Sequence, residues 1–130
     1  MEFVLLLGRI LFPLIFINSG VSHFTKRQGM VQHSASMGAP SPSLFVPLTG
    51  AMILLGGLSV LLGIYAQVGA LLIFVFLVPT AFIMHRFWGL QDPMMAANQQ
   101  AHFLKNIAVA GAALIIIYFG SGPLSLITWG

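Results

Sequence analysis

The sequence predicts an all-α fold: an integral membrane four-helix bundle with up-down-up-down antiparallel order. Hydrophobic residues make up 58% of the 130-residue chain and charged residues only 5%, whereas soluble domains carry roughly 25% charged residues. The apolar residues fall into four stretches of about 20 residues, the length that a helix needs to cross a bilayer. Short connections join most of these stretches, which favours antiparallel neighbours.

The four expected spans share high hydropathy and few charges, and together they form a single domain. They cover about residues 3–24, 44–64, 68–87 and 103–120. Pro13 lies near the middle of the first span and predicts a kink, because proline removes a backbone donor. Pro47 fits the first turn of the second span.

The connections also carry local signals. The long loop 25–43 contains a basic start and a proline-rich end, and we expect a short interfacial helix within it. Asp92 followed by Pro93 predicts a helix start, with aspartate as N-cap. This last helix begins outside the membrane and enters lipid near Phe103. The Gly-Ser-Gly-Pro run at 120–123 predicts its end, followed by interfacial residues up to 130.

The basic residues predict the orientation in the membrane. Loops one and three carry the basic side chains Lys26, Arg27, Arg86 and Lys105, against the single acid Asp92. The positive-inside rule then puts these two loops in the cytoplasm and both termini outside. A net charge of +3 on a soluble protein would suggest nucleic-acid binding. Here the basic residues lie at helix ends, so anionic lipid explains them and no nucleic acid is expected.

The absence of cysteine excludes disulfides, thiolate nucleophiles and iron–sulfur clusters. The chain also has no nucleophile elbow, P-loop or dinucleotide glycine fingerprint. We therefore assign no catalytic residue, and we expect no stand-alone enzyme.

Arg9 is the first candidate site residue. It lies about six residues inside the first span, roughly 9 Å deep, where insertion of a charge costs up to about 2.5–3.5 kcal/mol. One interpretation is that it reaches lipid phosphates or helix-end carbonyls. The other is that it donates to an anionic or carbonyl-bearing ligand.

The second candidate is a basic cluster at one membrane depth, formed by the ends of spans one and three and the start of span four. Asn98, His102 and Lys105 follow one helical face. Two interpretations remain open: lipid head-group contact, or a pocket for a negatively charged or reducible ligand. With Arg9, the candidate ligand or head-group residues are His23, His85, Arg86, His102, Lys105 and Asn106.

Histidines on facing helices could in principle bind haem or a metal. Arg86 and Lys105 stand next to them and oppose a metal cation, so we expect no metal site and disfavour haem. Four glycines of the second span are candidates for close helix packing, because small residues spaced by seven repeat on one face. They are the pairs Gly50 with Gly57 and Gly56 with Gly63.

Short motifs in a fixed order cover nearly the whole chain. They are Gly8-Arg9-Ile10-Leu11, Asn18-Ser19-Gly20, Met37-Gly38-Ala39-Pro40, Leu55-Gly56-Gly57-Leu58, His85-Arg86-Phe87-Trp88 and Phe103-Leu104-Lys105-Asn106. Their order and spacing resemble the DoxX family of small bacterial membrane proteins. The resemblance implies a bacterial inner (cytoplasmic) membrane location and a loose link to quinone-coupled redox chemistry.

This chain departs from the family pattern in two places. Many members carry a glutamate before the paired glycines, where this chain has 52–55 (Met-Ile-Leu-Leu), and a lysine where it has His23. Two functions follow as hypotheses. One is a quinone-linked redox subunit, with quinone as the cofactor. The alternative is a non-catalytic membrane anchor or assembly module. The partners would be the lipid bilayer, a redox or other membrane protein, and a second copy in a homo-oligomer.

Overall fold

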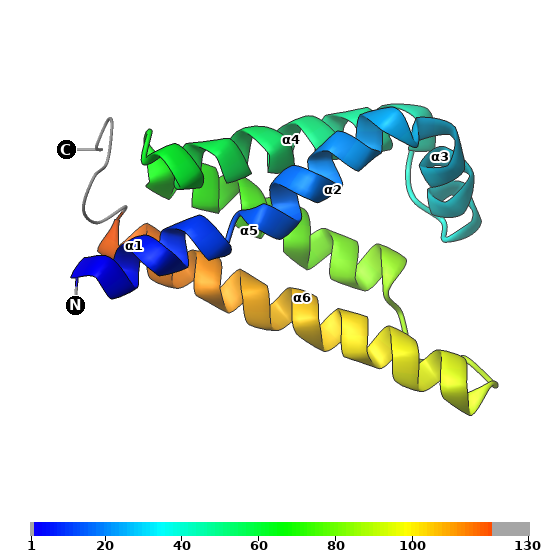
Figure 1. Cartoon of the computed structure of the whole chain (residues 1–130). Coiled ribbons are helices and arrows are strands. Elements are labelled where there is room, and N and C mark those ends of the chain that lie inside the picture. The colour runs from blue at the N-terminus through cyan, green and yellow to red at the C-terminus, as the bar shows by residue number, and fades with distance from the viewer. Residues whose placement is uncertain (1, 121–130) are drawn as a thin grey trace.

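The computed structural model describes residues 2–120. In that range it contains six α-helices and no β-strand (Figure 1). The helices are α1 (Glu2–Leu11), α2 (Leu14–Thr25), α3 (Arg27–Ser36), α4 (Pro42–Leu62), α5 (Ala66–Met84) and α6 (Pro93–Phe119). The predicted stop at 121–123 and the interfacial tail lie outside the described residues.

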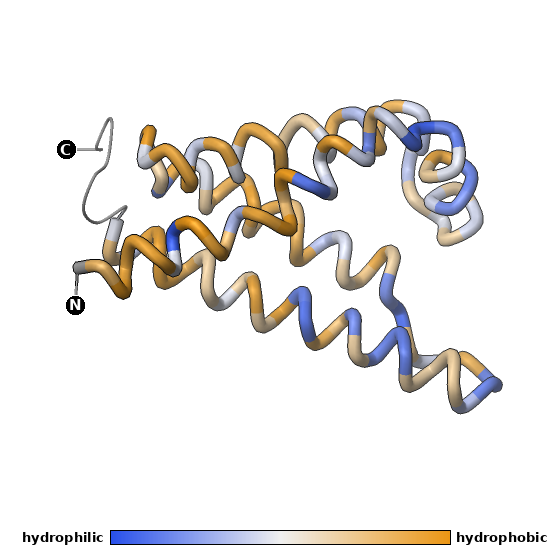
Figure 2. Tube along the Cα trace, in the orientation of Figure 1, coloured by the Kyte–Doolittle hydropathy of each residue, from blue (hydrophilic) through white to orange (hydrophobic). Residues whose placement is uncertain are grey.

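Four helical segments of the described chain are long and apolar enough to cross a membrane. They are Phe3–Thr25, Pro42–Leu62, Ala66–Met84 and Pro93–Phe119. The all-α, four-span prediction is therefore confirmed. Figure 2 shows hydrophobic residues along these segments, with hydrophilic residues gathered around α3 and the start of α6.

Pro13 does more than bend the first span. Helix α1 ends at Leu11 and α2 begins at Leu14, with the buried Pro13 between them. The ring of a proline has no N–H and clashes with the preceding turn. The Pro13 carbonyl instead accepts from the backbone N–H of Ile17 at 2.9 Å and restarts the helix.

Helix α4 lies at the centre of the packing, against α2 on one side and α5 on another, and α5 packs in turn against α6 (Figure 1). Close approach depends on small residues. A Cβ at Gly56 would lie 2.8 Å from the Gly69 carbonyl oxygen of α5. A Cβ at Gly57 would lie 2.9 Å from the Ile17 side chain of α2. The side chains that are fully buried in the core are Ile53, Val60, Ala70, Ile73, Ala81 and Ala113.

The connection from α4 to α5 is a tight turn. Gly63 ends α4 in the left-handed region, with φ of 70°, and its backbone N–H donates to the Val60 carbonyl. In the structure Gly63 thus ends the helix. At the far end of α5 the helix stops at Met84, so that His85 and the residues after it form the link to α6.

Candidate functional site

His85 is held at the end of α5 by a residue of α6. The Gln99 amide nitrogen donates to the Met84 carbonyl at 3.2 Å, which directs the amide oxygen of Gln99 to His85 Nδ1, also at 3.2 Å. The imidazole ring of His85 stacks on that of His102, with centroids 5.2 Å apart. Two residues of α6 therefore fix the histidine ring at the end of α5.

A cavity of about 130 Å³, here called the α6 cavity, lies between α2, α5 and α6. Its wall is largely apolar, with five polar side chains among the lining residues. The polar members are Ser19, Thr80, His85, Lys105 and Asn106, and the apolar members are Ile15, Phe16, Phe76, Leu77 and Val109.

Two of these polar side chains are largely buried and form no hydrogen bond within the described residues, and their polar atoms are not completely enclosed by protein. Asn106 is 5% exposed and Thr80 is 9% exposed. Within the described residues, neither side chain has a hydrogen-bond partner. Buried polar side chains nearly always have a partner, so these groups offer unused hydrogen-bonding capacity to whatever occupies the α6 cavity.

A second cavity of about 210 Å³, here called the α3 cavity, lies under α3 and shares Ser19, Phe76, Thr80 and His85 with the first. Its wall also includes His23 of α2 and His33 of α3. With His102 stacked on His85, all four histidines of the chain gather at this end. Sequence reasoning missed His33, Thr80 and Gln99, because no spacing signal links them to the cluster.

The cluster is rich in cations. Burial is the main cause that lowers the pKa of His85 from its usual value, and the neighbouring His102, Lys105 and His33 lower this pKa further, against a hydrogen bond to Gln99 that raises it. The acid Asp92 accepts the backbone N–H of Met94 as the N-cap of α6. In the described part of the chain, no group of three or more His, Asp or Glu residues is placed to hold a metal ion.

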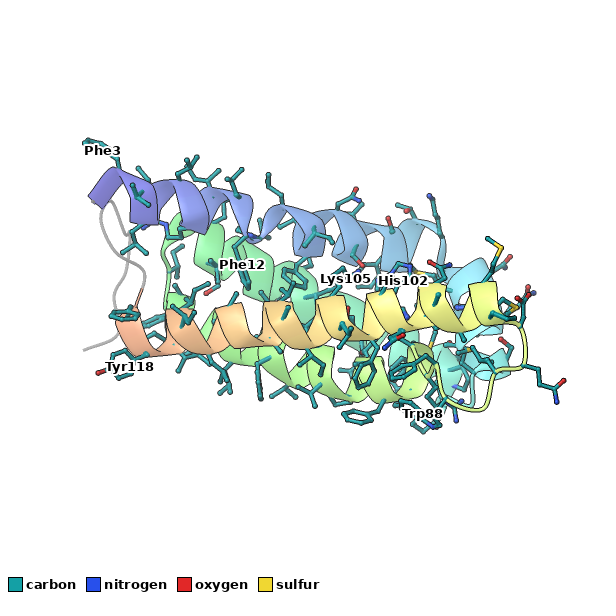
Figure 3. All side chains as sticks on the ribbon, turned by 90° about the horizontal axis from the view of Figure 1, so that it is seen from below. Phe3, Phe12, Trp88, His102, Lys105 and Tyr118 are labelled. Atoms are coloured by element: carbon teal, nitrogen blue, oxygen red, sulfur yellow. The ribbon has the colours of Figure 1, made fainter. Side chains whose placement is uncertain are left out.

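The remaining predicted residues, Arg86 and Arg9, lie in two different places. The Arg86 guanidinium donates to the Met37 carbonyl, just after α3. Arg9 is buried in a separate apolar cavity between α1 and the end of α6. Figure 3 shows His102 and Lys105 on successive turns of α6, toward the end where Trp88 lies, and Phe3 and Tyr118 at the other end. The structure thus joins His23, His85, His102, Lys105 and Asn106 but leaves Arg9 apart.

Four apolar segments around two small cavities define a multi-pass helical membrane protein. The DoxX family model matches residues 4–86, most of the chain, and the chain therefore belongs to the DoxX family. Two relatives come from Escherichia coli K12. Inner membrane protein YphA is 33% identical over 123 residues, which cover 95% of this chain and 87% of the relative. Inner membrane protein YqjF is 31% identical over 121 residues, which cover 93% and 87%.

Both relatives are inner membrane proteins, and with four apolar spans this chain is a multi-pass inner-membrane protein surrounded by lipid. No solved structure matches the chain. The family match ends at Arg86, so Lys105 and Asn106 on α6 lie outside it, although the alignments to the two relatives cover at least 93% of the chain.

Proposed function

We propose that this protein binds the head group of a quinone in the α6 cavity and acts as a quinone-linked subunit of the inner membrane. The observation that carries the proposal is the pair of buried polar side chains, Asn106 and Thr80, which line that cavity without a partner in the described residues. A bound molecule with carbonyl oxygens would satisfy them.

The size of the cavity favours a single ring. At about 130 Å³ it is close to the ~150 Å³ cavity that takes up benzene, and well below the ~300–1,000 Å³ of sites for larger ligands. Ile15 lines the cavity and is half-exposed on the outer face of α2. A ring would therefore fill the cavity while an isoprenoid tail lies in the surrounding lipid.

The chemistry of the wall fits the two carbonyl groups of a quinone ring. The Asn106 amide, the Thr80 hydroxyl and the Lys105 ammonium are hydrogen-bond donors, and carbonyl oxygens are acceptors. The apolar residues Phe16, Leu77 and Val109 suit the faces of the ring. A hydrogen bond of this kind contributes about 0.5–1.5 kcal/mol, and rather more if Lys105 donates it.

The test is binding of a short-chain ubiquinone to the purified protein in mild detergent, measured by calorimetry. Asn106→Leu should weaken binding by about tenfold, because about 1.4 kcal/mol corresponds to that factor. The matched control is Asn98→Leu, an exposed asparagine two turns earlier on α6, which should leave affinity unchanged. Wild-type protein that binds no quinone, or equal affinity of both variants, would contradict the proposal.

The alternative function is a non-catalytic anchor for a partner protein, with contact at the start of α6. One observation favours it: Met94 and Met95 are 82% and 57% exposed ahead of the apolar part of the helix, and exposed methionines adapt well to varied surfaces. Photo-crosslinkers at 94 or 95 should give one discrete adduct with another protein in native membranes. A crosslinker at Phe3, also well exposed, should not.

We also propose that the spans alternate up and down, with α3 and the 85–92 link in the cytoplasm and both termini outside. The second half of the first span, at residues 15–19, lines the α6 cavity together with residues 105–109 of α6. The first half of that span, at Val4, Gly8 and Phe12, lines a cavity with residues 112–120. The first and last spans thus pair in reverse order, which supports opposite chain directions. The chain has no cysteine, so single cysteines report the side. Gln28→Cys and Gln91→Cys should react with an impermeant thiol reagent only from the cytoplasm, and Phe3→Cys only from outside.

A further inference from the structure

The tautomer of His85 follows from its partner. The Gln99 amide nitrogen is engaged by the Met84 carbonyl, so the Gln99 oxygen faces His85 Nδ1. An amide oxygen can only accept, and Nδ1 therefore carries the hydrogen. In the neutral ring the lone pair is then on Nε2, which makes this nitrogen of His85 a hydrogen-bond acceptor.

We propose that His85 Nε2 accepts a hydrogen bond from a hydroxyl group of the reduced ligand, a hydroquinone, and takes up its proton. This inference rests on the proposed function, since it concerns the same α6 cavity. The inference adds a preference of the cavity for the reduced form, because a quinone carbonyl has no hydrogen to donate to Nε2. In the transfer, the O–H bond breaks, an N–H bond forms on Nε2, and the ligand oxygen keeps the electron pair. No electron leaves the ligand in this step.

The surroundings of His85 stabilise the negative oxygen that this transfer leaves on the ligand. The ligand oxygen becomes negative next to the new imidazolium, with Lys105 also on the cavity wall. The chain contains only two acidic residues, and the nearer one, Asp92, caps α6. A negative oxygen would thus meet uncompensated positive charge. Burial and neighbouring cations also lower the pKa of His85, so the ring is neutral and able to accept near pH 7.

The α3 cavity gives the proton a way out. His85 lies on the walls of both cavities, and beyond it the α3 cavity reaches His23 and the exposed His33. The Nδ1 of His23 donates to the Ser19 carbonyl at 2.7 Å, which leaves its Nε2 as a second acceptor. At about 210 Å³ the cavity has room for several waters, at roughly 30 Å³ each.

The test compares an oxidised and a reduced short-chain ubiquinone, measured anaerobically by calorimetry between pH 5 and 8. For the wild type, affinity for the quinol should fall as the pH is lowered toward 5, because an imidazolium cannot accept a hydrogen bond. Affinity for the quinone should not fall. In His85→Gln the pH dependence of quinol binding should disappear, and at pH 8 quinol should lose more affinity than quinone.

Four groups face His85 from other elements: His23 on α2, His33 on α3, and His102 and Lys105 on α6. His23→Gln, His33→Gln and His102→Gln should each keep the fall in quinol affinity at low pH. If one of them removes it while His85→Gln keeps it, the assignment to His85 is overturned. Equal pH profiles for quinol and quinone in the wild type would also overturn it.

A second measurement uses the wild-type protein, so it does not depend on whether a His85 variant folds. In protein labelled with ¹⁵N-histidine only four side chains contribute, and quinol should shift the Nε2 signal of one of them toward a hydrogen-bonded position, an effect absent with quinone. If quinone binds but quinol produces no such shift, the role of His85 is contradicted while the proposed function stands. Absence of binding by either form would instead contradict the proposed function.

Discussion

The imidazole rings of His85 and His102 lie face to face, with centroids 5.2 Å apart and 23° between their planes. His85 ends α5, and His102 lies in the third turn of α6. Face contact of two protonated rings would bring like charges together in a partly buried place. This contact acts in the same direction as burial, and both favour the neutral form of His85.

The first prediction concerns pH and stability. The pKa of His85 is lower in the folded protein than its usual value near 6.5, so the unfolded chain binds the proton more readily. His85 therefore contributes stability that is present above about pH 6.5 and is lost as the pH falls through the lowered folded value. Thermal unfolding in detergent between pH 4.5 and 8 should show this loss. His85→Gln should have a flatter profile, and an unchanged slope would contradict the assignment.

The second prediction concerns the contact between α4 and α5. A Cβ at Gly56 would lie 2.8 Å from a backbone oxygen, which cannot move without shifting α5. Gly56→Ala should therefore destabilise the protein by about 1–3 kcal/mol through overpacking. The control is Gly111→Ala on α6, where a Cβ would have no atom within 4 Å and no loss is expected. Melting temperatures of both variants check this, and equal values would argue against close α4–α5 packing.

The third prediction compares two glycines by backbone conformation. Gly63 has φ of 70° at the end of α4, where an L-residue is disfavoured by about 1–2 kcal/mol. Gly8 lies inside α1 with open space around it. Gly63→Ala should lower the free energy of unfolding, while Gly8→Ala should raise it by about 0.4–1 kcal/mol. Denaturation of both variants in one detergent gives the sign of each change.

The fourth prediction concerns the start of α6. The Asp92 side chain accepts the Met94 N–H at 3.0 Å, and loss of such a cap costs about 1 kcal/mol. Asp92→Ala should speed amide hydrogen exchange in the first turn of α6, and Asp92→Asn, which can still accept, should not. Slow exchange in both variants would mean that the cap does not hold this turn.

The four spans and the helix start at Asp92 were predictable because their causes are local. A backbone in lipid must satisfy its own hydrogen bonds, so about 20 apolar residues form a helix whatever surrounds them. An N-cap acts on an N–H two residues away. The break at Pro13 was only partly predictable: proline weakens the helix locally, but whether the chain bends or stops depends on what Pro13 packs against.

The candidate site was predictable only in part. His23, His85, His102 and Lys105 share one end, as the expected antiparallel order of the spans predicts. Among the cavities described above, Arg9 lines the one between α1 and the end of α6 and not the two that hold the histidines. Nothing in the sequence singled out His33, Thr80 or Gln99 as site residues. A histidine in a connecting segment, a threonine within a helix and a glutamine expected at the surface are each explained without a binding role.

The sequence by itself determined that this is a four-span helical membrane protein of the DoxX family, because hydropathy, helix length and motif order are properties of the linear chain. Only the tertiary structure decided that Asn106 and Thr80 are buried beside one cavity and that Gln99 orients His85. The reason is physical. Whether a polar side chain finds a partner depends on which helix faces meet, and that is fixed by packing between residues far apart in the chain.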